Sequence, residues 1–428
     1  MIVGKKKGNV MSERADEAVA GGGLLHRRAL LGVAAAMGAA GAARAAESVG
    51  QGSPASMLKP GRGFETYGVP SDWEKPVLKS VAAGAGRPGT GVSRTPLHML
   101  EGTITPAGLH FERHHNGVPD IDPNKHELLI HGLVERPLIF TRETLSRYPM
   151  ETRVHFVECA GNTGGNAGPG GLTADVTALY GLLSNSEWTG VPLKILLDEA
   201  GVKKEARWVL AEGADPAAMS RSVPMEVCLD DAMVALYQNG EAIRPAQGYP
   251  MRLLLPGKQG NANVKWLRRI KAIPTPMNTK DETSKYSLLL PDGRAEQFHL
   301  ELGVKSAILK PSPGLTMKGP GLYEISGLAW TGGGKIKKVE VSADGGKSWA
   351  VAALTGPVQS KAATRFRMPW RWDGSPAVLL SRATDETGAV QPTRNAWLAM
   401  YGPGQGYHYN AIQSWAVAAN GTVTNVYL

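Results

Sequence analysis

The stretch that decides the fold is RVHFVECAGNTGGNAGPGG, residues 153–171. Its first half reads as a short apolar strand that ends at Cys159, and its second half is a glycine-rich loop. Glycines at such a point let the backbone come close to a bulky group. Because the chain has only two cysteines, a disulfide framework is excluded. Cys159 is therefore a buried thiol, half of one bridge to Cys228, or a soft ligand for a transition metal.

The length and composition indicate a globular protein of more than one domain. The chain has 428 residues, of which 42% are hydrophobic and 20% are charged. This length allows two or three domains with their own cores, and the composition is typical of soluble proteins. The 53 glycines and 29 prolines favour loops and β structure.

Residues 1–45 have the features of a twin-arginine export signal that is later removed. The pair Arg27-Arg28 precedes an apolar run of small residues, and Ala43-Arg44-Ala45 offers a cleavage site. A membrane anchor is the alternative, but the run is about 15 residues long, and a span needs roughly 20. We therefore expect a periplasmic protein that has no membrane span in its mature chain.

The charge of the mature chain argues against nucleic-acid binding. Removing residues 1–45 leaves 40 basic and 35 acidic residues, a net charge of +5. No basic stripe interleaved with aromatic residues is present in the sequence. A nucleic-acid partner is thus not expected.

Three further segments follow the signal. Residues 46–95 are rich in proline and glycine and predict an extended arm. In residues 96–292, short strands alternate with helical stretches such as VPLKILLDEAG (191–201), which predicts an α+β domain. Residues 293–428 contain β-rich segments with a turn at 344–346 and no helical pattern, which predicts an immunoglobulin-like β-sandwich.

A second group of chemically active residues lies in LHFERHHNGVPDID, residues 109–122. His110, Arg113, His114 and His115 fall within six positions. They could form a zinc site, although no HExxH or paired CxxC motif supports it, or an anion cradle for phosphate or oxo groups. Surface histidines without a function are the third alternative.

A third group lies in RPAQGYPMRLLLPGKQGNANVKWLRR, residues 244–269. Gly257 and Gly260 free backbone amides, and Lys258 or Lys265 supplies positive charge, as in loops that approach a phosphate. The order of a P-loop is missing, so the segment alone is a weak indication.

Taken in order, these stretches resemble the sulfite oxidase family of molybdopterin enzymes from about residue 97 to the C-terminus. The motifs are FERHH followed by VP (111–119), ECAGN (158–162), GYPMRLLLPG (248–257) and NVKW (263–266). The segment ISGLAWTGGGKIKKVEVSADGGKSW resembles the dimerisation domain of that family. The resemblance implies an α+β molybdopterin-binding domain followed by an immunoglobulin-like dimerisation domain.

The resemblance also implies a cofactor and a set of site residues. Cys159 would be the protein thiolate on molybdenum, with Arg113 and Tyr237 as further catalytic candidates. The molybdenum–molybdopterin cofactor would be held by Phe111, Glu112, Arg113, His114, His115, Asp215, Gln247, Arg252, Asn263, Val264 and Lys265. Gln247 stands where many members carry a histidine. Tyr237 lies one residue closer to the Asn-Gly glycine than the family tyrosine, so either the strand bulges or Tyr237 points away.

Two departures from the family pattern bear on the substrate. Sulfite-oxidising members typically carry an arginine after Cys-Ala-Gly-Asn and often a Trp-x-Arg near the C-terminus, whereas this chain has Thr163-Gly164-Gly165 and Trp415-Ala416-Val417. Each missing charge-assisted contact weakens the binding of a small oxyanion about tenfold or more. The pattern resembles members that oxidise sulfane sulfur on the cysteine of a carrier protein, in thiosulfate oxidation.

The same resemblance implies partners. Electrons would pass to a c-type cytochrome subunit, and since no CxxCH occurs in the sequence, this chain would carry no haem. A homodimer of this subunit within a heterotetramer is expected. The alternatives are a direct sulfite dehydrogenase and, without enzymatic activity, an exported β-sandwich binding protein.

Overall fold

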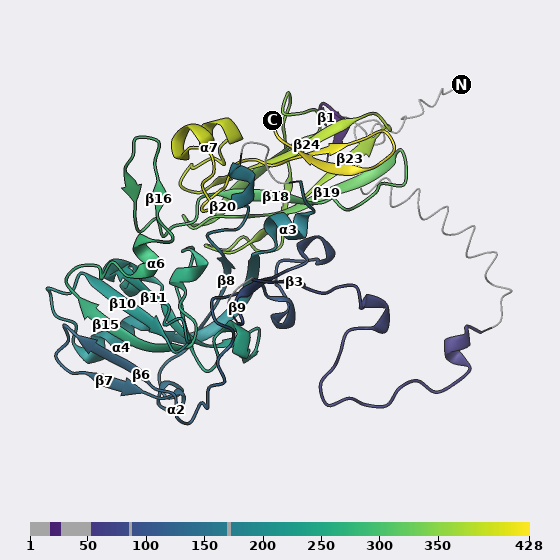
Figure 1. Ribbon diagram of the computed structural model, residues 1–428. Coiled ribbons are helices and arrows are strands. Elements are labelled where there is room, and N and C mark those ends of the chain that lie inside the picture. The colour runs from purple at the N-terminus through teal and green to yellow at the C-terminus, as the bar shows by residue number, and fades with distance from the viewer. Residues whose placement is uncertain (1–17, 27–52, 85–87, 169–172) are drawn as a thin grey trace, which may run out of the picture.

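The structure, a computed structural model, describes residues 18–26, 53–84, 88–168 and 173–428. Figure 1 shows an N-terminal body that mixes sheets and short helices, joined to a sandwich of long strands. The α+β architecture that the sequence predicts is thereby confirmed. Of the predicted export signal, residues 1–17 and 27–45 lie outside the described residues.

Three sheets build the N-terminal body. The first, in the order β13-β12-β9-β8 with β14 also paired to β12, has the strands β8 (Glu151–Glu158), β9 (Leu183–Pro192), β12 (Met233–Gln238), β13 (Glu241–Ala242) and β14 (Arg252–Leu254). The second, in the order β11-β10-β15-β6-β7, has the strands β6 (Leu128–Gly132), β7 (Leu138–Phe140), β10 (Trp208–Gly213), β11 (Ser220–Pro224) and β15 (Leu267–Ile273). The third contains β3 (Ser80–Ala83), β4 (Gly91–Arg94) and β5 (Glu112–His114).

Short helices and one hairpin complete this body. The helices are α2 (Arg142–Leu145), α3 (Val176–Tyr180), α4 (Leu193–Ala200), α5 (Met225–Asp230) and α6 (Lys280–Thr283), and the hairpin strands are β16 (Leu288–Leu289) and β17 (Ala295–Glu296). Helix α4 buries Leu193, Leu196, Leu197 and Ala200, a spacing that places them on one face. It ends at Gly201, whose φ of 69° is the left-handed conformation of a helix C-cap.

The C-terminal domain is a β-sandwich. One sheet, in the order β1-β2-β23-β19-β18 with β22 on β23, has the strands β1 (Ala18–Ala20), β2 (Leu24–Leu25), β18 (Lys305–Lys310), β19 (Gly321–Trp330), β22 (Ala353–Thr355) and β23 (Thr364–Trp372). The other, in the order β21-β20-β24-β25-β26, has the strands β20 (Ile336–Ser342), β21 (Ala350–Val351), β24 (Ala377–Asp385), β25 (Ser414–Val417) and β26 (Val423–Val426). The buried tryptophans Trp330, Trp370 and Trp415 belong to the shared core. Gly345 and Gly346, both with positive φ, make the predicted turn between β20 and β21.

Two features of the C-terminal domain differ from the prediction. Helix α7 (Arg394–Tyr401) interrupts the strands, because Thr393 caps its N-terminus and Trp397 packs against Tyr409 and Ala167 of the glycine-rich loop. Residues 18–26, assigned by sequence to the export signal, pair with β23 as added strands.

The predicted arm is largely exposed up to β3, whose pairing with β4 attaches it to the body. Figure 1 shows its described part running out from the N-terminal body. Among the described residues, no helix is long and apolar enough to cross a membrane.

Candidate active site

Cys159 stands where β8 ends and the glycine-rich loop begins. Its amide donates to the carbonyl of Leu182 at 3.0 Å, and its carbonyl accepts from the amide of Asn162 at 2.9 Å, which turns the chain sharply. Gly260 packs against this point, because a Cβ there would lie 2.8 Å from the carbonyl oxygen of Glu158. The start of the loop is thus held between the segment at Leu182 and the segment at Gly260.

Both cysteines are free, so the bridge to Cys228 is absent. Cys228 lies in α5 inside the hydrophobic core, where burial raises the pKa of its thiol to about 12. Cys159 is partly exposed, and it lines a cavity of about 700 Å³ that is partly open to solvent. Burial raises the pKa of the Cys159 thiol, so its thiolate form needs a neighbouring cation, which a bound metal supplies.

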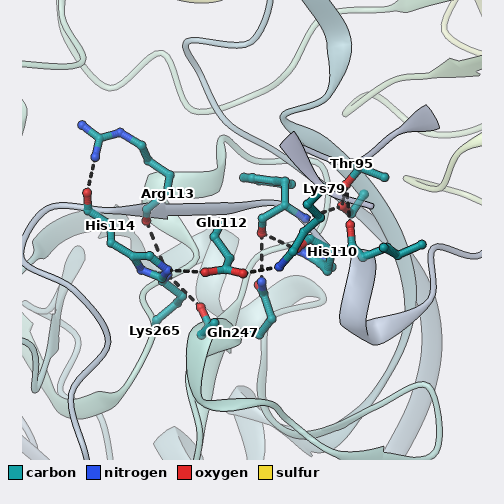
Figure 2. Close-up of polar contacts among 12 residues, drawn as sticks. Lys79, Thr95, His110, Glu112, Arg113, His114, Gln247 and Lys265 are labelled. Atoms are coloured by element: carbon teal, nitrogen blue, oxygen red, sulfur yellow. Dashed lines mark hydrogen bonds and ion pairs between the residues drawn. The ribbon is translucent and has the colours of Figure 1, made fainter. Parts of the chain in front are cut away.

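The cavity gathers most of the residues that the sequence assigned to the cofactor. Of those, the cavity is lined by Phe111, Arg113, His114, His115, Asp215, Gln247, Arg252, Asn263, Val264 and Lys265. Glu112 lies behind this wall, where it pairs with His114 at 3.0 Å and with Lys79 (Figure 2). The segments 110–115 and 247–266 therefore meet around Cys159, as the ordered motifs predicted.

Two cations of the cavity wall, the buried Arg252 and the partly buried Lys265, have few acidic neighbours. Arg252 donates to the carbonyls of Gln247 and Asn263, both at 3.0 Å, and within the described residues its Nε has no hydrogen-bond partner. Lys265 Nζ donates to the Ala246 carbonyl at 3.0 Å and to His114 Nδ1 at 2.9 Å. Burial lowers the pKa of both, that of Lys265 to about 7. An anionic group in the cavity would restore these pKa values and take the free donor.

The histidines of residues 109–122 each contact a different partner and do not form one metal-binding group. His110 contacts the Phe111 carbonyl at 3.0 Å, His114 lies between Glu112 and Lys265, and His115 contacts the hydroxyl of Tyr286 at 3.3 Å. Figure 2 shows His110 and His114 in separate parts of this hydrogen-bond network. No group of three His, Cys, Asp or Glu side chains suited to a metal occurs among the described residues. The zinc alternative is therefore unsupported, and the anion cradle fits.

Tyr237, whose place at the site the sequence left open, does not line the cavity. The register of β12 shifts between Ala235 and Tyr237, so the strand bulges there. The side chain of Tyr237 instead packs with the guanidinium of Arg142, 5.3 Å from the ring centre. The bulge thus directs Tyr237 away from Cys159.

The tyrosine in the cavity is Tyr286, which the sequence analysis missed. It lines the cavity with Cys159 and His115, and burial raises the pKa of its hydroxyl. Its φ of 54° is unusual for a bulky residue, which indicates a conformation fixed by its surroundings. No strand or turn pattern in the sequence marks this position, which lies 20 residues after the end of the NVKW motif.

A buried ion pair stands behind Cys159. Glu158 Oε1 lies 2.8 Å from Lys305 Nζ, and Glu158 Oε2 accepts from Trp330 Nε1 at 2.7 Å. Asn162 Nδ2 also donates to Glu158, at 2.8 Å. Since Lys305 and Trp330 belong to the sandwich, the C-terminal domain takes part in holding the cysteine loop.

The two positions that depart from the family pattern face away from the cavity. Thr163 is buried, donates to the Tyr409 carbonyl at 2.7 Å and accepts from Lys305 at 2.7 Å. Gly164 is fixed by the C-terminal segment, because a Cβ there would lie 2.2 Å from the carbonyl oxygen of Gly406. Val417 lies in the sandwich core, so its position gives no information on how the cavity binds an oxyanion.

The thiol and the cationic side chains that line the same cavity fit a metal–pterin group that carries a phosphate. This combination defines a class, the molybdopterin-dependent oxidoreductases. Residues 115–280 match the model of the oxidoreductase molybdopterin binding domain, and residues 296–414 match the Mo-co oxidoreductase dimerisation domain.

Similarity to known proteins indicates a family within this class. The chain is 31% identical to the sulfite oxidase of Gallus gallus over 69% of this chain and 70% of that enzyme. It is 32% identical to the NADH nitrate reductase of Solanum lycopersicum over 72% of this chain, but it spans 38% of that enzyme's length. The crystal structure of the sulfane dehydrogenase SoxCD from Paracoccus pantotrophus superposes with a TM-score of 0.84 at 44% identity, over 88% of this chain and 100% of that one.

The chain belongs to the sulfite oxidase family of molybdopterin enzymes. It is an oxidoreductase whose cofactor is molybdenum–molybdopterin, and its C-terminal sandwich is a dimerisation domain. The alternative of a binding protein without enzymatic activity is therefore excluded.

Proposed function

We propose that this chain is the molybdenum subunit of a periplasmic sulfane dehydrogenase. It oxidises sulfane sulfur bound to the cysteine of a carrier protein and passes the electrons to a c-type cytochrome subunit. The similarity to the sulfane dehydrogenase SoxCD, at 44% identity over the whole of that chain, supports this assignment.

The bound molybdenum–molybdopterin supplies the two-electron oxidation of sulfur. The chain's residues anchor and orient it. Cys159 provides the thiolate, and Arg252 and Lys265 provide charge-assisted donors for the phosphate. His114 holds its Nε2 proton toward Glu112, so its Nδ1 accepts from Lys265 and fixes that lysine in the wall. Tyr286, which contacts His115, directs a hydroxyl group to the region of Cys159.

The observation that carries the substrate assignment is the loop after Cys159. Residues 160–172 contain no charged side chain. Thr163, where sulfite-oxidising members carry arginine, directs its hydroxyl to Lys305 and Tyr409 instead of the cavity. A loop without charged side chains binds a free dianion weakly. A sulfur atom on a peptide segment of a carrier protein gains affinity from the contacts that this segment makes.

The test compares two substrates of the purified molybdenum-loaded protein, with cytochrome c reduction as the readout. One substrate is a carrier protein with a cysteine persulfide, and the other is free sulfite. We expect the carrier to give a kcat/KM at least tenfold higher than sulfite. Equal or faster turnover of sulfite would contradict the proposal and leave the family assignment intact.

Direct sulfite dehydrogenation is the second candidate. It is favoured by the cavity cations Arg113, Arg252 and Lys265, and by 31% identity to the sulfite oxidase of Gallus gallus. It predicts saturable turnover of free sulfite in the absence of any carrier protein.

The proposed location rests on the sequence of residues 1–45, with its arginine pair and small apolar run. Replacing both arginines, Arg27→Lys and Arg28→Lys, should keep the protein in the cytoplasmic fraction of a host that has the twin-arginine route. The proposed assembly, a homodimer bound to two cytochrome subunits, is tested by light scattering of the co-expressed complex.

A further inference from the structure

Residues 18–26, with the sequence AVAGGGLLH, lie on the C-terminal sandwich nearly 350 positions away in the chain. Strand β1 pairs with β2, and β2 pairs with β23 at Leu24 and Trp370. Figure 1 shows β1 at one end of the sandwich, and β2 lies between β1 and β23 in the sheet. The segment therefore extends a sheet of the C-terminal domain.

Polar contacts fix this segment in one register. The indole of Trp370 donates to the Gly22 carbonyl at 2.7 Å, and the amide of Arg371 donates to the Gly23 carbonyl at 2.8 Å. The amide of Gly21 donates to the hydroxyl of Ser348 at 2.7 Å. Three consecutive glycines are thus each bonded to the sandwich.

Apolar burial adds to these contacts. Leu24 is 0% exposed and Leu25 is 3% exposed, and Leu24 belongs to the same core cluster as Trp370. A leucine buried to this extent is a core residue of the domain and not a surface contact. The segment therefore completes the sandwich core.

The slot, which is the part of the sandwich that contacts residues 21–23, leaves no room for a Cβ on these glycines. A Cβ at Gly21 would lie 2.4 Å from Asp344 Oδ2, and one at Gly22 would lie 2.5 Å from the Ala343 carbonyl oxygen. A Cβ at Gly23 would lie 2.1 Å from the Arg371 carbonyl oxygen. Two of these obstacles are backbone atoms, which cannot turn aside, and Gly22 and Gly23 also have positive φ.

The segment covers an edge that another strand leaves open. Strand β22 pairs with β23 from Arg365 to Arg367, and β2 takes the same edge at Trp370. A sheet edge with free amides and carbonyls is prone to pair with other chains. Residues 18–26 cover this edge beyond the end of β22.

We propose that residues 18–26 are a docking strand, by which the uncut chain binds its own N-terminal segment to the folded sandwich. The slot joins the turn after β20 with the end of β23, two segments that meet only in the folded domain. Docking of the residues directly before Arg27-Arg28 thus depends on a folded C-terminal domain. One consequence rests on the proposed removal of residues 1–45. This cleavage takes residues 18–26 away and exposes the edge of β23.

The test is hydrogen exchange of the full chain, loaded with cofactor. In Gly23→Val and in Leu24→Asp, we expect the peptides covering residues 18–26 and 369–372 to exchange at least tenfold faster than in the unchanged chain. Gly63→Val is the matched control, because a Cβ at Gly63 meets nothing within 4 Å. Exchange along β8 reports whether each variant has folded.

A peptide with the sequence AVAGGGLLH, added in excess to Leu24→Asp, should restore slow exchange at residues 369–372. Unchanged exchange in both variants would overturn the proposal, and so would a peptide that gives no protection. Sulfur oxidation should be the same in all these proteins. Because the exchange readout does not depend on turnover, failure of docking and failure of the proposed function are separate results.

Discussion

Lys305→Met should destabilise the protein strongly through the loop that carries Cys159. Lys305 Nζ lies 2.8 Å from Glu158 Oε1 and faces the rings of Tyr180 and Trp330 at 5.7 and 5.8 Å. The side chains of Lys305 and Glu158 are 4% and 3% exposed, so water does not screen the pair. Removing the lysine leaves a carboxylate buried without its counter-charge.

The expected magnitude follows from that burial. Breaking a buried ion pair by removing one partner costs about 3 to 5 kcal/mol of unfolding free energy. Replacing both partners, with Glu158→Gln added to Lys305→Met, should recover all but about 1 kcal/mol. The reason is that no buried charge remains, while the single amide oxygen of glutamine keeps one of the two hydrogen bonds, from Trp330 or from Asn162, and the other is lost.

The assay is urea unfolding of the two single variants and the double variant, with the molybdenum content of each measured after purification. Lys310→Met is the matched control at the other end of β18, because its pair with Glu101 is partly exposed and worth less than about 1 kcal/mol. A loss below about 1 kcal/mol in Lys305→Met would refute the reasoning, as would a double variant that is no more stable than the single one.

Three further outcomes are expected. Cys159→Ser should unfold at the same urea concentration as the unchanged protein but lose turnover, and full turnover would contradict its role as metal ligand. Tyr286→Phe should lower kcat at least about tenfold at unchanged molybdenum content, while Tyr237→Phe should leave kcat unchanged, since Tyr237 packs on Arg142. Burial lowers the pKa of His155 to about 4. As the pH falls from about 6.5 to 4, His155 therefore binds a proton in the unfolded chain but not in the folded chain. About 3 kcal/mol of stability is lost in that window, and His155→Gln should remove this part of the pH dependence in urea titrations.

The sequence predicted those parts of the site that local pattern determines. The apolar run before Cys159 and the glycines after it predicted β8 and its loop, and the NVKW motif predicted the position of Lys265. Charge and hydrogen-bonding capacity follow directly from residue type, so the anion cradle could be predicted as well. These features are short-range, and each is visible within about ten residues of chain.

What the sequence could not show depends on contacts between distant segments. Tyr286 enters the cavity from an irregular segment, and the sequence left open both the bulge of β12 and the direction of Tyr237. The docking of residues 18–26 depends on backbone atoms near residue 343 and residue 371. Periodicity carries no information on such contacts, because they arise only once the sheets are stacked.

The loop that carries Cys159 depends on both domains, although the two family models divide the chain between them at residues 281–295. Glu158 comes from the N-terminal body, but the groups that neutralise it and bond to it, Lys305 and Trp330, come from the sandwich. Thr163 and Gly164 of the same loop are fixed by the C-terminal residues Tyr409 and Gly406. Without the sandwich, Glu158 would lose the amine and the indole that bond to it, and the loop would lose the residues that pack behind it. The dimerisation domain is therefore a structural part of the active site, and the N-terminal body alone should not hold Cys159 in the geometry that a metal requires.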